Sequence, residues 1–282
     1  MTDLADNHRD WIGKSQTVDD IATLSPVARF SATLDRDDPP PAEGDVLPPA
    51  WHWLYFLPAD PQSGLGPDGH GARGHFLPPI VQPRRMWAGS RFRFLGPIRL
   101  GQPIQRRTTI VDVVSKTGRN GPLLFVNQCH DILADGAVAV AEEQDLVFRD
   151  APRPDETAPP PQAAPGEVQW ERTIEPDPVL LFRFSALTFN GHRIHYDHPY
   201  VTQVEGYPGL VVHGPLLGTL LIDLIRRNVA DKPLASFGFR ALRPVFDISS
   251  FKIQGRRDGD DVTVWALDNE GHVAMTATGE LG

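Results

Sequence analysis

Four histidines and an aspartate fall within one short window of the second half of the chain: His192, His195, Asp197, His198 and His213. An unperturbed imidazole exchanges a proton near neutral pH, so this window is a candidate site of general acid–base catalysis. Histidine and carboxylate side chains would also suit a zinc or iron ion. In a third interpretation, part of the cluster consists of core histidines whose hydrogen bonds are satisfied.

Arg193 argues against the metal ion. It stands between His192 and His195, where its cation would lie inside the set of ligands, and the segment shows no regular helical pattern. We therefore expect no metal here, and we expect at least one imidazole to act as a general acid or base.

A glycine-bearing segment, GLVVHGPL at 209–216, leads from the histidine window into a predicted helix. Leucine and isoleucine recur at intervals of three and four residues, which predicts a helix over 215–227 with Pro215 in its first turn. The backbone N–H of Gly214 would lie at the helix N-terminus, where it can stabilise a developing oxyanion, and a glycine lets a ligand approach the backbone. An ordinary glycine at a helix N-cap is the alternative interpretation.

Two further motifs carry less weight. The string at 69–74 has the G-x-G-x-x-G spacing of dinucleotide-binding loops, but its proline-rich flanks leave neither the strand nor the helix that such a loop requires, so we predict a plain loop. The chain has no G-x-S-x-G string, and Cys129 lies within a predicted strand, where we expect a packed side chain rather than a nucleophile.

Cationic and aromatic residues lie together at Arg84, Arg85 and Trp87. They could bind phosphates, as in a nucleotide-bearing thioester carrier, or they could belong to a solvated loop. Arg240 and Arg243 carry the same ambiguity.

Helical segments precede a run of antiparallel strands in each half of the chain. Besides the helix over 215–227, helical patterns cover 18–34, 51–56 and 178–187. Patterns typical of strands, separated by turns such as 116–121, cover 108–114, 123–132, 137–148, 236–242, 245–254, 262–267 and 273–278. One helix per half, covered by one antiparallel sheet, is an α+β architecture.

A proline-rich segment at 151–166 separates the halves and contains no large apolar residue. Such a segment is typical of a semi-rigid spacer. We therefore expect an N-terminal domain over 1–150, a linker over 151–166 and a C-terminal domain over 167–282.

Composition excludes several classes of protein. The 282 residues carry a net charge of −9, which argues against a nucleic-acid partner or an anionic membrane surface. No apolar run is long enough to span a membrane, and the N-terminal residues resemble neither a signal peptide nor a transit peptide. The single cysteine excludes an intrachain disulfide and a multi-cysteine metal site. We expect a cytoplasmic globular protein.

The segment FSALTFNGHRIHYD at 184–197 resembles the hydratase motif of the MaoC, or (R)-specific enoyl-CoA hydratase, hot-dog family. In that family an aspartate and a histidine five residues apart form the catalytic pair. Asn190 stands at the position of the family aspartate and His195 at that of the histidine. VVHG at 211–214 is similar to the family's glycine-bearing start of the central helix.

The first half, with RMWAG at 85–89 and KTG at 116–118, resembles the degenerate first hot dog of the family's two-domain branch. That branch contains the type 2 3-hydroxyacyl-thioester dehydratases and the mesaconyl-C4-CoA and itaconyl-CoA hydratases. The resemblance implies a double hot-dog fold in which each half wraps an antiparallel sheet around a central helix. It also implies that the second half is the catalytic one.

The implied reaction is the reversible hydration of a 2-enoyl-CoA thioester without a metal or organic cofactor. The Gly214 N–H would polarise the thioester carbonyl, and His195 would take a proton from the water that adds to C3. Asn190 would hold that water in line, because an amide cannot titrate as a carboxylate does.

The resemblance leaves the substrate open among three alternatives. They are a C5-dicarboxylyl thioester (mesaconyl-C4-CoA or itaconyl-CoA, giving citramalyl-CoA), a 3-hydroxyacyl thioester of fatty-acid metabolism, and an acyl thioester that is bound without catalysis. Residues expected to contact the substrate are Arg84, Arg85, Trp87, His192, Arg193 and His213. One of the three arginines would meet a free carboxylate or the phosphates of CoA. A homodimer is expected from the family.

Overall fold

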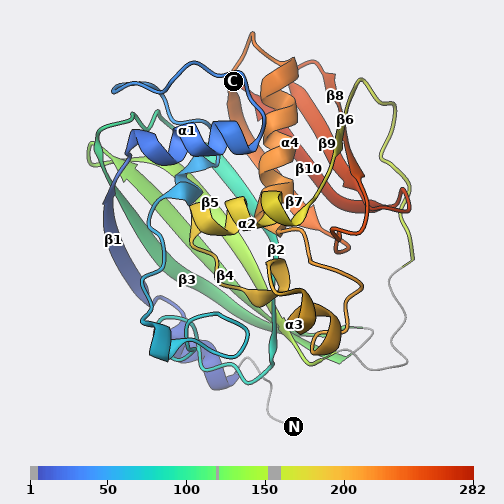
Figure 1. Cartoon of the computed structure of the whole chain (residues 1–282). Coiled ribbons are helices and arrows are strands. Elements are labelled where there is room, and N and C mark those ends of the chain that lie inside the picture. The colour runs from blue at the N-terminus through green and yellow to red at the C-terminus, as the bar shows by residue number, and fades with distance from the viewer. Residues whose placement is uncertain (1–5, 119–120, 152–159) are drawn as a thin grey trace.

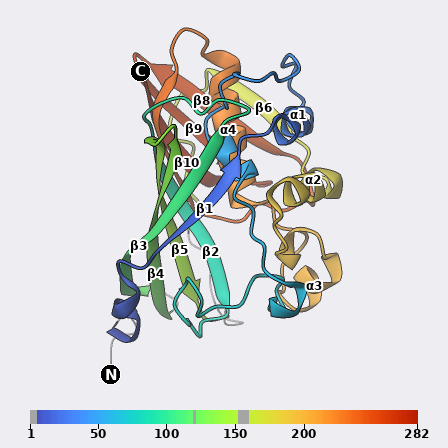
Figure 2. The same ribbon diagram turned by 90° about the vertical axis from the view of Figure 1, so that its left-hand side faces the viewer.

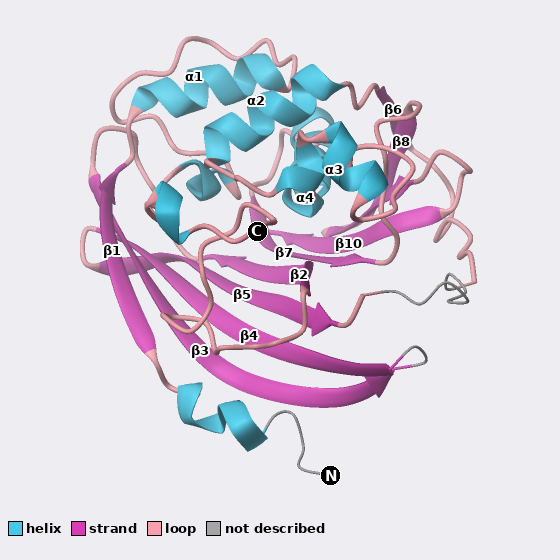
Figure 3. Ribbon diagram, turned by 60° about the horizontal axis from the view of Figure 1, so that its bottom comes forward, coloured by secondary structure: helices cyan, strands magenta, loops and turns pink. Residues whose placement is uncertain are grey.

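The computed structural model describes residues 6–118, 121–151 and 160–282. All ten strands in this part of the chain join in one antiparallel sheet. The strand order is β1-β3-β4-β5-β2-β7-β10-β9-β8-β6. The sheet curves around the helices, which lie on its concave side (Figure 3).

The two halves of the chain repeat one topology. The first half contains β1 (Ser15–Ile21), β2 (Arg84–Phe94), β3 (Pro103–Gly118), β4 (Gly121–Ala134) and β5 (Ala137–Arg149). The second contains β6 (Trp170–Ile174), β7 (Leu234–Ala241), β8 (Phe251–Asp258), β9 (Asp261–Leu267) and β10 (Val273–Leu281). In each half the first strand lies at the outer edge, the second lies at the centre, and the last three form a meander between them. β2 and β7 pair with each other and so join the halves.

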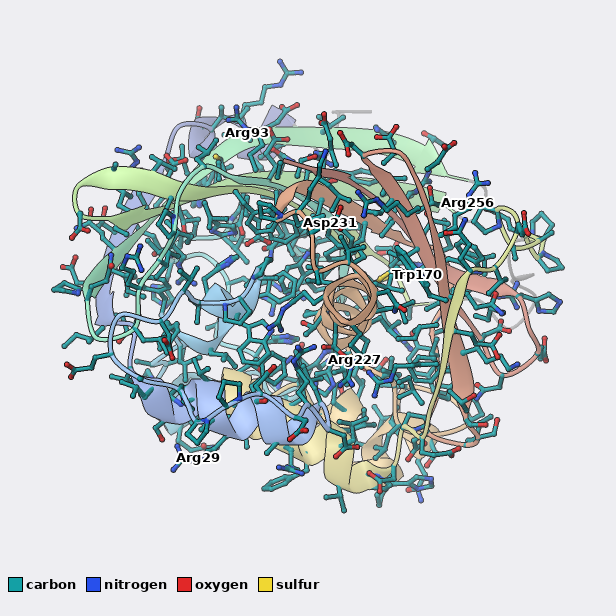
Figure 4. The ribbon with its side chains drawn as sticks, turned by 90° about the horizontal axis from the view of Figure 1, so that it is seen from above. Arg29, Arg93, Trp170, Arg227, Asp231 and Arg256 are labelled. Atoms are coloured by element: carbon teal, nitrogen blue, oxygen red, sulfur yellow. The ribbon has the colours of Figure 1, made fainter. Side chains whose placement is uncertain are left out.

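Four α-helices lie on the sheet: α1 (Leu24–Thr33), α2 (Pro178–Thr188), α3 (His198–Gln203) and α4 (Gly214–Asn228). Helix α4 packs against β6, β8, β9 and β10, and every residue from Leu216 to Ile225 is buried. Figure 4 looks down its axis and shows α4 between the sheet on one side and α1 and α2 on the other. Within the described residues, no helix is both long and apolar enough to cross a bilayer.

The first half has no counterpart of α4. In place of a central helix, this half has a single 3-10 turn, Trp51–Leu54, whose Trp51 and Leu54 side chains are buried. His52 and Trp53 each bond the buried carboxylate of Glu142 on β5, at 3.1 and 3.0 Å. Helix α1 instead lies against α2, on the outer side of the helical layer (Figures 1 and 2).

Two of the predicted helices need correction. The helix predicted over 18–34 is wrong at its start, because Ser15–Ile21 forms strand β1 and the helix covers only Leu24–Thr33. β1 is an edge strand with few buried side chains, so it lacks the alternation of apolar and polar residues that marks a strand. The helical pattern over 51–56 corresponds to only one 3-10 turn, Trp51–Leu54.

Two further points about strands need correction. The segment around Trp87 is part of the central strand β2, which rules out the alternative of a solvated loop. The strand predicted over 245–254 begins only at Phe251. Val245 is buried but lies before the sheet, where its carbonyl accepts the N–H of Val212 at 2.8 Å. Apolar residues in that stretch therefore support the loop that leads into α4.

The remaining element predictions are confirmed. α2 and α4 correspond to the helices predicted over 178–187 and 215–227. The other predicted strands lie within β3, β4, β5, β9 and β10, and the one predicted over 236–242 matches β7 except for its last residue. The predicted turn at 116–121 and the predicted linker at 151–166 fall partly outside the described residues, at 119–120 and 152–159. The domain limits at 150 and 167 stay a prediction.

A buried carboxylate on α4 ties the halves together. Asp223 is 1% exposed and forms ion pairs with Arg36 of the first half, with Arg172 of β6 at 2.8 Å and with Arg227 of α4 at 2.7 Å. Arg227 is labelled beside α4 in Figure 4. Removing the charge of Asp223 would leave three partly buried guanidinium groups without their shared anion.

We expect Asp223→Asn to lower the free energy of unfolding by about 3 kcal/mol, because breaking a buried ion pair leaves its partner uncompensated. Chemical denaturation of both proteins measures the difference. Asp260→Asn is the control, because Asp260 is 53% exposed in its pair with Lys232 and should contribute little. Equal stability of the two variants would contradict the role assigned to Asp223.

Candidate active site

Two imidazoles stack at the start of α4. His195 closes a 3-10 turn, Arg193–His195, and His213 directly precedes α4. Their ring centroids lie 3.7 Å apart with an interplanar angle of 19°. His195 is 7% exposed and His213 is fully buried. Two protonated rings at this distance would repel each other, so the stack disfavours two charged imidazoles, and the burial of both rings favours their neutral forms.

The backbone determines which nitrogen of His195 carries the proton. Nδ1 lies 2.7 Å from the carbonyl oxygen of Val211, so Nδ1 holds the hydrogen and Nε2 keeps a lone pair. Within the described residues, Nε2 has no hydrogen-bond partner in the protein. Burial lowers the pKa of His195 to about 4, and the Val211 hydrogen bond offsets only part of that effect. His195 is therefore a neutral proton acceptor over the physiological range.

His213 is held from the opposite side by α2. Its Nε2 lies 2.8 Å from Oγ of Ser185, and its ring lies 4.8 Å from that of Phe184. Burial, followed by the charges of His195 and His192, lowers the pKa of His213 far below its usual value. His213 thus supports His195 as a neutral, packed ring. The interpretation of core histidines with satisfied hydrogen bonds holds only in part, because Nδ1 of His213 is buried without a hydrogen-bond partner among the described residues.

Asn190 follows the end of α2. Phe189 ends that helix in the left-handed conformation (φ 48°), and this turns the chain so that the Oδ1 of Asn190 accepts the N–H of His192 at 3.0 Å. Since Oδ1 is occupied, the amide NH2 of Asn190 remains as a donor. An aspartate here would leave a second carboxylate oxygen in place of that donor.

Gly214 is the first residue of α4, and Pro215, which has no N–H, follows it. Within the described part of the chain, no protein acceptor takes the Gly214 N–H. A Cβ added to Gly214 would lie 3.8 Å from the carbonyl oxygen of Trp87 on β2. The predicted oxyanion donor therefore lies at the junction of the two halves, next to a strand of the first half (Figure 1).

A loop of the first half covers the histidine window, which the sequence did not predict. Gly69 (φ +88°) lies so close to Gly191 that a Cβ on Gly69 would collide with the Gly191 carbonyl oxygen. The carbonyl of Asp68 accepts the N–H of Arg193 at 2.9 Å. The His70 ring packs on His192 with centroids 4.2 Å apart. The string at 69–74 is a loop, as predicted, but it belongs to the site.

Asp68, His70 and His192 are close enough to share a metal ion, since one ligand atom of each lies within 4.8 Å of the others. Charge argues against a cation: Arg85 and Arg73 both contribute to lowering the pKa of His70, after burial. Asp68 already accepts a hydrogen bond from Nδ1 of His70 at 2.9 Å. Burial raises the pKa of Asp68, but His70 more than offsets this, so Asp68 stays ionised. The trio forms one wall of the site, in which Asp68 is hydrogen-bonded to His70 and the His192 ring packs on that of His70.

Two of the three predicted arginines already have an ion-pair partner. Arg84 pairs with Glu205 at 2.5 Å, and Arg193 pairs with Asp197 at 2.7 Å. Trp87 is half-buried, and its Nε1 donates to Oγ of Ser90 at 3.0 Å. Arg85 lies on β2 and forms no such pair.

His198, Arg240 and Cys129 do not join the site. His198 is exposed on α3, Arg240 is exposed on β7, and Cys129 is half-buried on β4. Arg243 pairs with Asp268 at 3.2 Å.

The chain is similar to known proteins over most of its length. A family described as hydroxyacyl-thioester dehydratase type 2 matches residues 50–247. A mesaconyl-C(4)-CoA hydratase of Chloroflexus aurantiacus is 46% identical over 272 residues, which cover 96% of this chain and 97% of the relative. The mitochondrial hydroxyacyl-thioester dehydratase type 2 of Schizosaccharomyces pombe is 28% identical over 80% of this chain and 85% of the relative.

A solved structure supports the fold. A Mycobacterium tuberculosis protein described as having a double hotdog fold superposes with a TM-score of 0.59 at 13% identity, over 96% of each chain. The double hot-dog fold expected from the sequence is thereby confirmed, and it agrees with the repeated strand topology.

We expect the imidazole of His195 to stay neutral at pH 6 and to take up a proton only near pH 4, because burial penalises its charged form. NMR titration of histidine-labelled protein, assigned with a His195→Gln variant, measures this. In the urea-unfolded control the same group should titrate near 6.5. The unfolded state binds the proton more tightly, so stability is retained above pH 6.5 and falls as the pH drops toward 4. Titration of folded His195 near 6.5 would contradict the account.

Proposed function

The chain belongs to the hydroxyacyl-thioester dehydratase type 2 family, and we propose that it catalyses the reversible addition of water to a 2-enoyl-CoA thioester. The observation that carries the proposal is the neutral His195, whose free Nε2 lies in one site with the unpaired N–H of Gly214. A base and an oxyanion donor in the same site are what this reaction requires.

The start of α4 would receive the thioester carbonyl. The Gly214 N–H lies at the positive end of the helix dipole, where a growing negative charge on the carbonyl oxygen is stabilised. Because Pro215 has no N–H, the Gly214 N–H is the only donor of these two residues. Polarisation of the carbonyl makes C3 of the enoyl group electrophilic and gives C2 enolate character.

His195 would then move the proton. Its Nε2 takes a proton from the water whose oxygen adds to C3, and the NH2 of Asn190 donates to that water oxygen and positions it. The imidazolium returns the proton to C2, so the atoms of water are divided between C3 and C2. A pKa of about 4 in the free site makes the imidazolium a ready proton donor to the enolate carbon.

For the substrate we propose mesaconyl-C4-CoA, with citramalyl-CoA as the product. The support is the 46% identity over nearly the whole length of a relative that carries this name. Itaconyl-CoA is a second C5-dicarboxylyl candidate that no observation here favours. The family name favours, as the second candidate function, dehydration of 3-hydroxyacyl thioesters of fatty-acid metabolism.

We further propose a cytoplasmic homodimer. Val179, Phe182 and Phe189 on or next to α2 are each more than 60% exposed, and an apolar stripe of this kind favours a protein contact. A CoA-thioester substrate is in keeping with a cytoplasmic location.

We expect His195→Ala to lower kcat/KM for mesaconyl-C4-CoA by about 10²- to 10⁴-fold, the usual contribution of a general acid–base group. Asn190→Asp should stay within about tenfold of the parent if residue 190 only positions water, because the carboxylate can accept a hydrogen bond from that water in place of the donor it removes. Loss of the enoyl-thioester absorbance and the product mass measure the reaction. Full activity of His195→Ala would contradict the mechanism. If the parent turns over neither mesaconyl-C4-CoA nor crotonyl-CoA nor longer enoyl-CoAs, a non-catalytic binding protein is favoured.

We expect Gly214→Ala to fold normally, since the added Cβ would clash with no protein atom. Its kcat/KM should fall about 10²-fold, because the methyl group displaces the thioester carbonyl from the backbone N–H. Steady-state kinetics and a thermal melt measure the two effects. Gly96→Ala is the matched control, since its Cβ would also have room, 4.0 Å from the Cα of Ala139, and Gly96 lies away from the site. An active Gly214→Ala variant would remove Gly214 from the mechanism.

A further inference from the structure

Arg85 is the one site arginine whose guanidinium has neither a hydrogen-bond nor an ion-pair partner in the described part of the protein. It lies on β2, and its side chain is half-buried. Burial lowers the pKa of Arg85 to about 10, so the group remains a cation at neutral pH. A partly desolvated guanidinium without a partner is costly unless an anion completes it.

The guanidinium groups of the neighbouring arginines already have hydrogen-bond or ion-pair partners. Arg84 is held by the side chain and the carbonyl of Glu205, and Arg193 by Asp197 and the carbonyl of Pro67. Arg73 donates to the carbonyl oxygens of a nearby turn, those of Ile80, Gln82 and Pro83. None of the three has a free guanidinium edge comparable to that of Arg85.

The charge of Arg85 reaches the wall of the active site. It contributes to lowering the pKa of both His70 and His192, and the His192 ring lies 5.3 Å from that of His195. Two residues along the same strand, the carbonyl of Trp87 faces Gly214. Arg85 therefore lies on the side of the site that the first half of the chain supplies.

Two carboxylates lie within electrostatic range of Arg85 but do not neutralise it by contact. Asp68 is bonded to His70, and Asp60 is exposed, where water screens its charge. The guanidinium thus remains available for a ligand that approaches through the site.

We propose that Arg85 binds the free carboxylate of a 3-carboxylated enoyl-CoA thioester and so selects dicarboxylyl substrates over plain fatty-acyl ones. This inference rests on the proposed hydration. In mesaconyl-C4-CoA the free carboxylate is bonded to C3, the carbon to which water adds, so its partner must lie beside His195 and the wall formed by His70 and His192. Arg85 has that position, and a guanidinium can bind both carboxylate oxygens.

A matched pair of thioesters tests the inference. Mesaconyl-C4-CoA and 3-methylcrotonyl-CoA differ only in a carboxylate replaced by a methyl group on C3. We expect Arg85→Met to lower kcat/KM for mesaconyl-C4-CoA by about 30- to 1,000-fold, the usual effect of removing one partner of a buried charge pair. The inhibition constant of 3-methylcrotonyl-CoA should change less than about threefold. Arg91→Gln is the control, because Arg91 lies on the same strand but pairs at the surface with Asp145.

The outcomes are distinct. Equal losses with both thioesters would overturn the inference and assign Arg85 to the CoA moiety or to stability, and no loss with either would also overturn it. Arg85→Lys retains a cation and should recover part of the selectivity. If Arg85→Met does not fold, binding to the His195→Gln protein, which keeps Arg85, tests the inference instead. This protein should bind mesaconyl-C4-CoA at least about tenfold more tightly than 3-methylcrotonyl-CoA. Equal affinities would overturn the inference. Failure of the proposed function is separate, because then the parent protein hydrates no enoyl-CoA.

Discussion

The site depends on the burial of two stacked imidazoles, which favours the neutral form of both rings in the free site. Each ring is held by a different element: His195 by the Val211 carbonyl before α4, and His213 by Ser185 on α2. The Val211 bond selects the tautomer whose Nε2 is a proton acceptor. Desolvation, which usually weakens a charged group, here keeps the base unprotonated and ready near neutral pH.

The duplicated topology explains how the rest of the site is supplied. Both halves place their second strand at the centre of the sheet, so β2 reaches the start of α4 on the other half. The second half keeps the long helix and the histidine window. The first half has only the 3-10 turn Trp51–Leu54 at its centre, and it contributes β2 and the loop carrying Asp68 and His70. The second half thus supplies the proposed chemistry and the first half the wall of the acyl site.

The sequence predicted the parts of the site that are close in the chain. Asn190, His195 and Gly214 lie within one window, and the leucine spacing of α4 fixes where that window ends. The loop with Asp68 and His70 could not be found in this way, because more than a hundred residues separate it from His192. Contacts formed in the folded chain, such as those of Gly69 with Gly191 and of His70 with His192, bring the two together. The charges of β2 concealed a central strand, since its arginines are half-buried or exposed and interrupt the apolar pattern of a core strand.

The most direct test is a crystal structure of His195→Gln with mesaconyl-C4-CoA bound. The account predicts the thioester oxygen within about 3 Å of the Gly214 nitrogen, C3 beside residue 195, and the free carboxylate on the guanidinium of Arg85. A substrate whose carbonyl lies away from the start of α4, or whose C3 lies out of reach of residue 195, would contradict it.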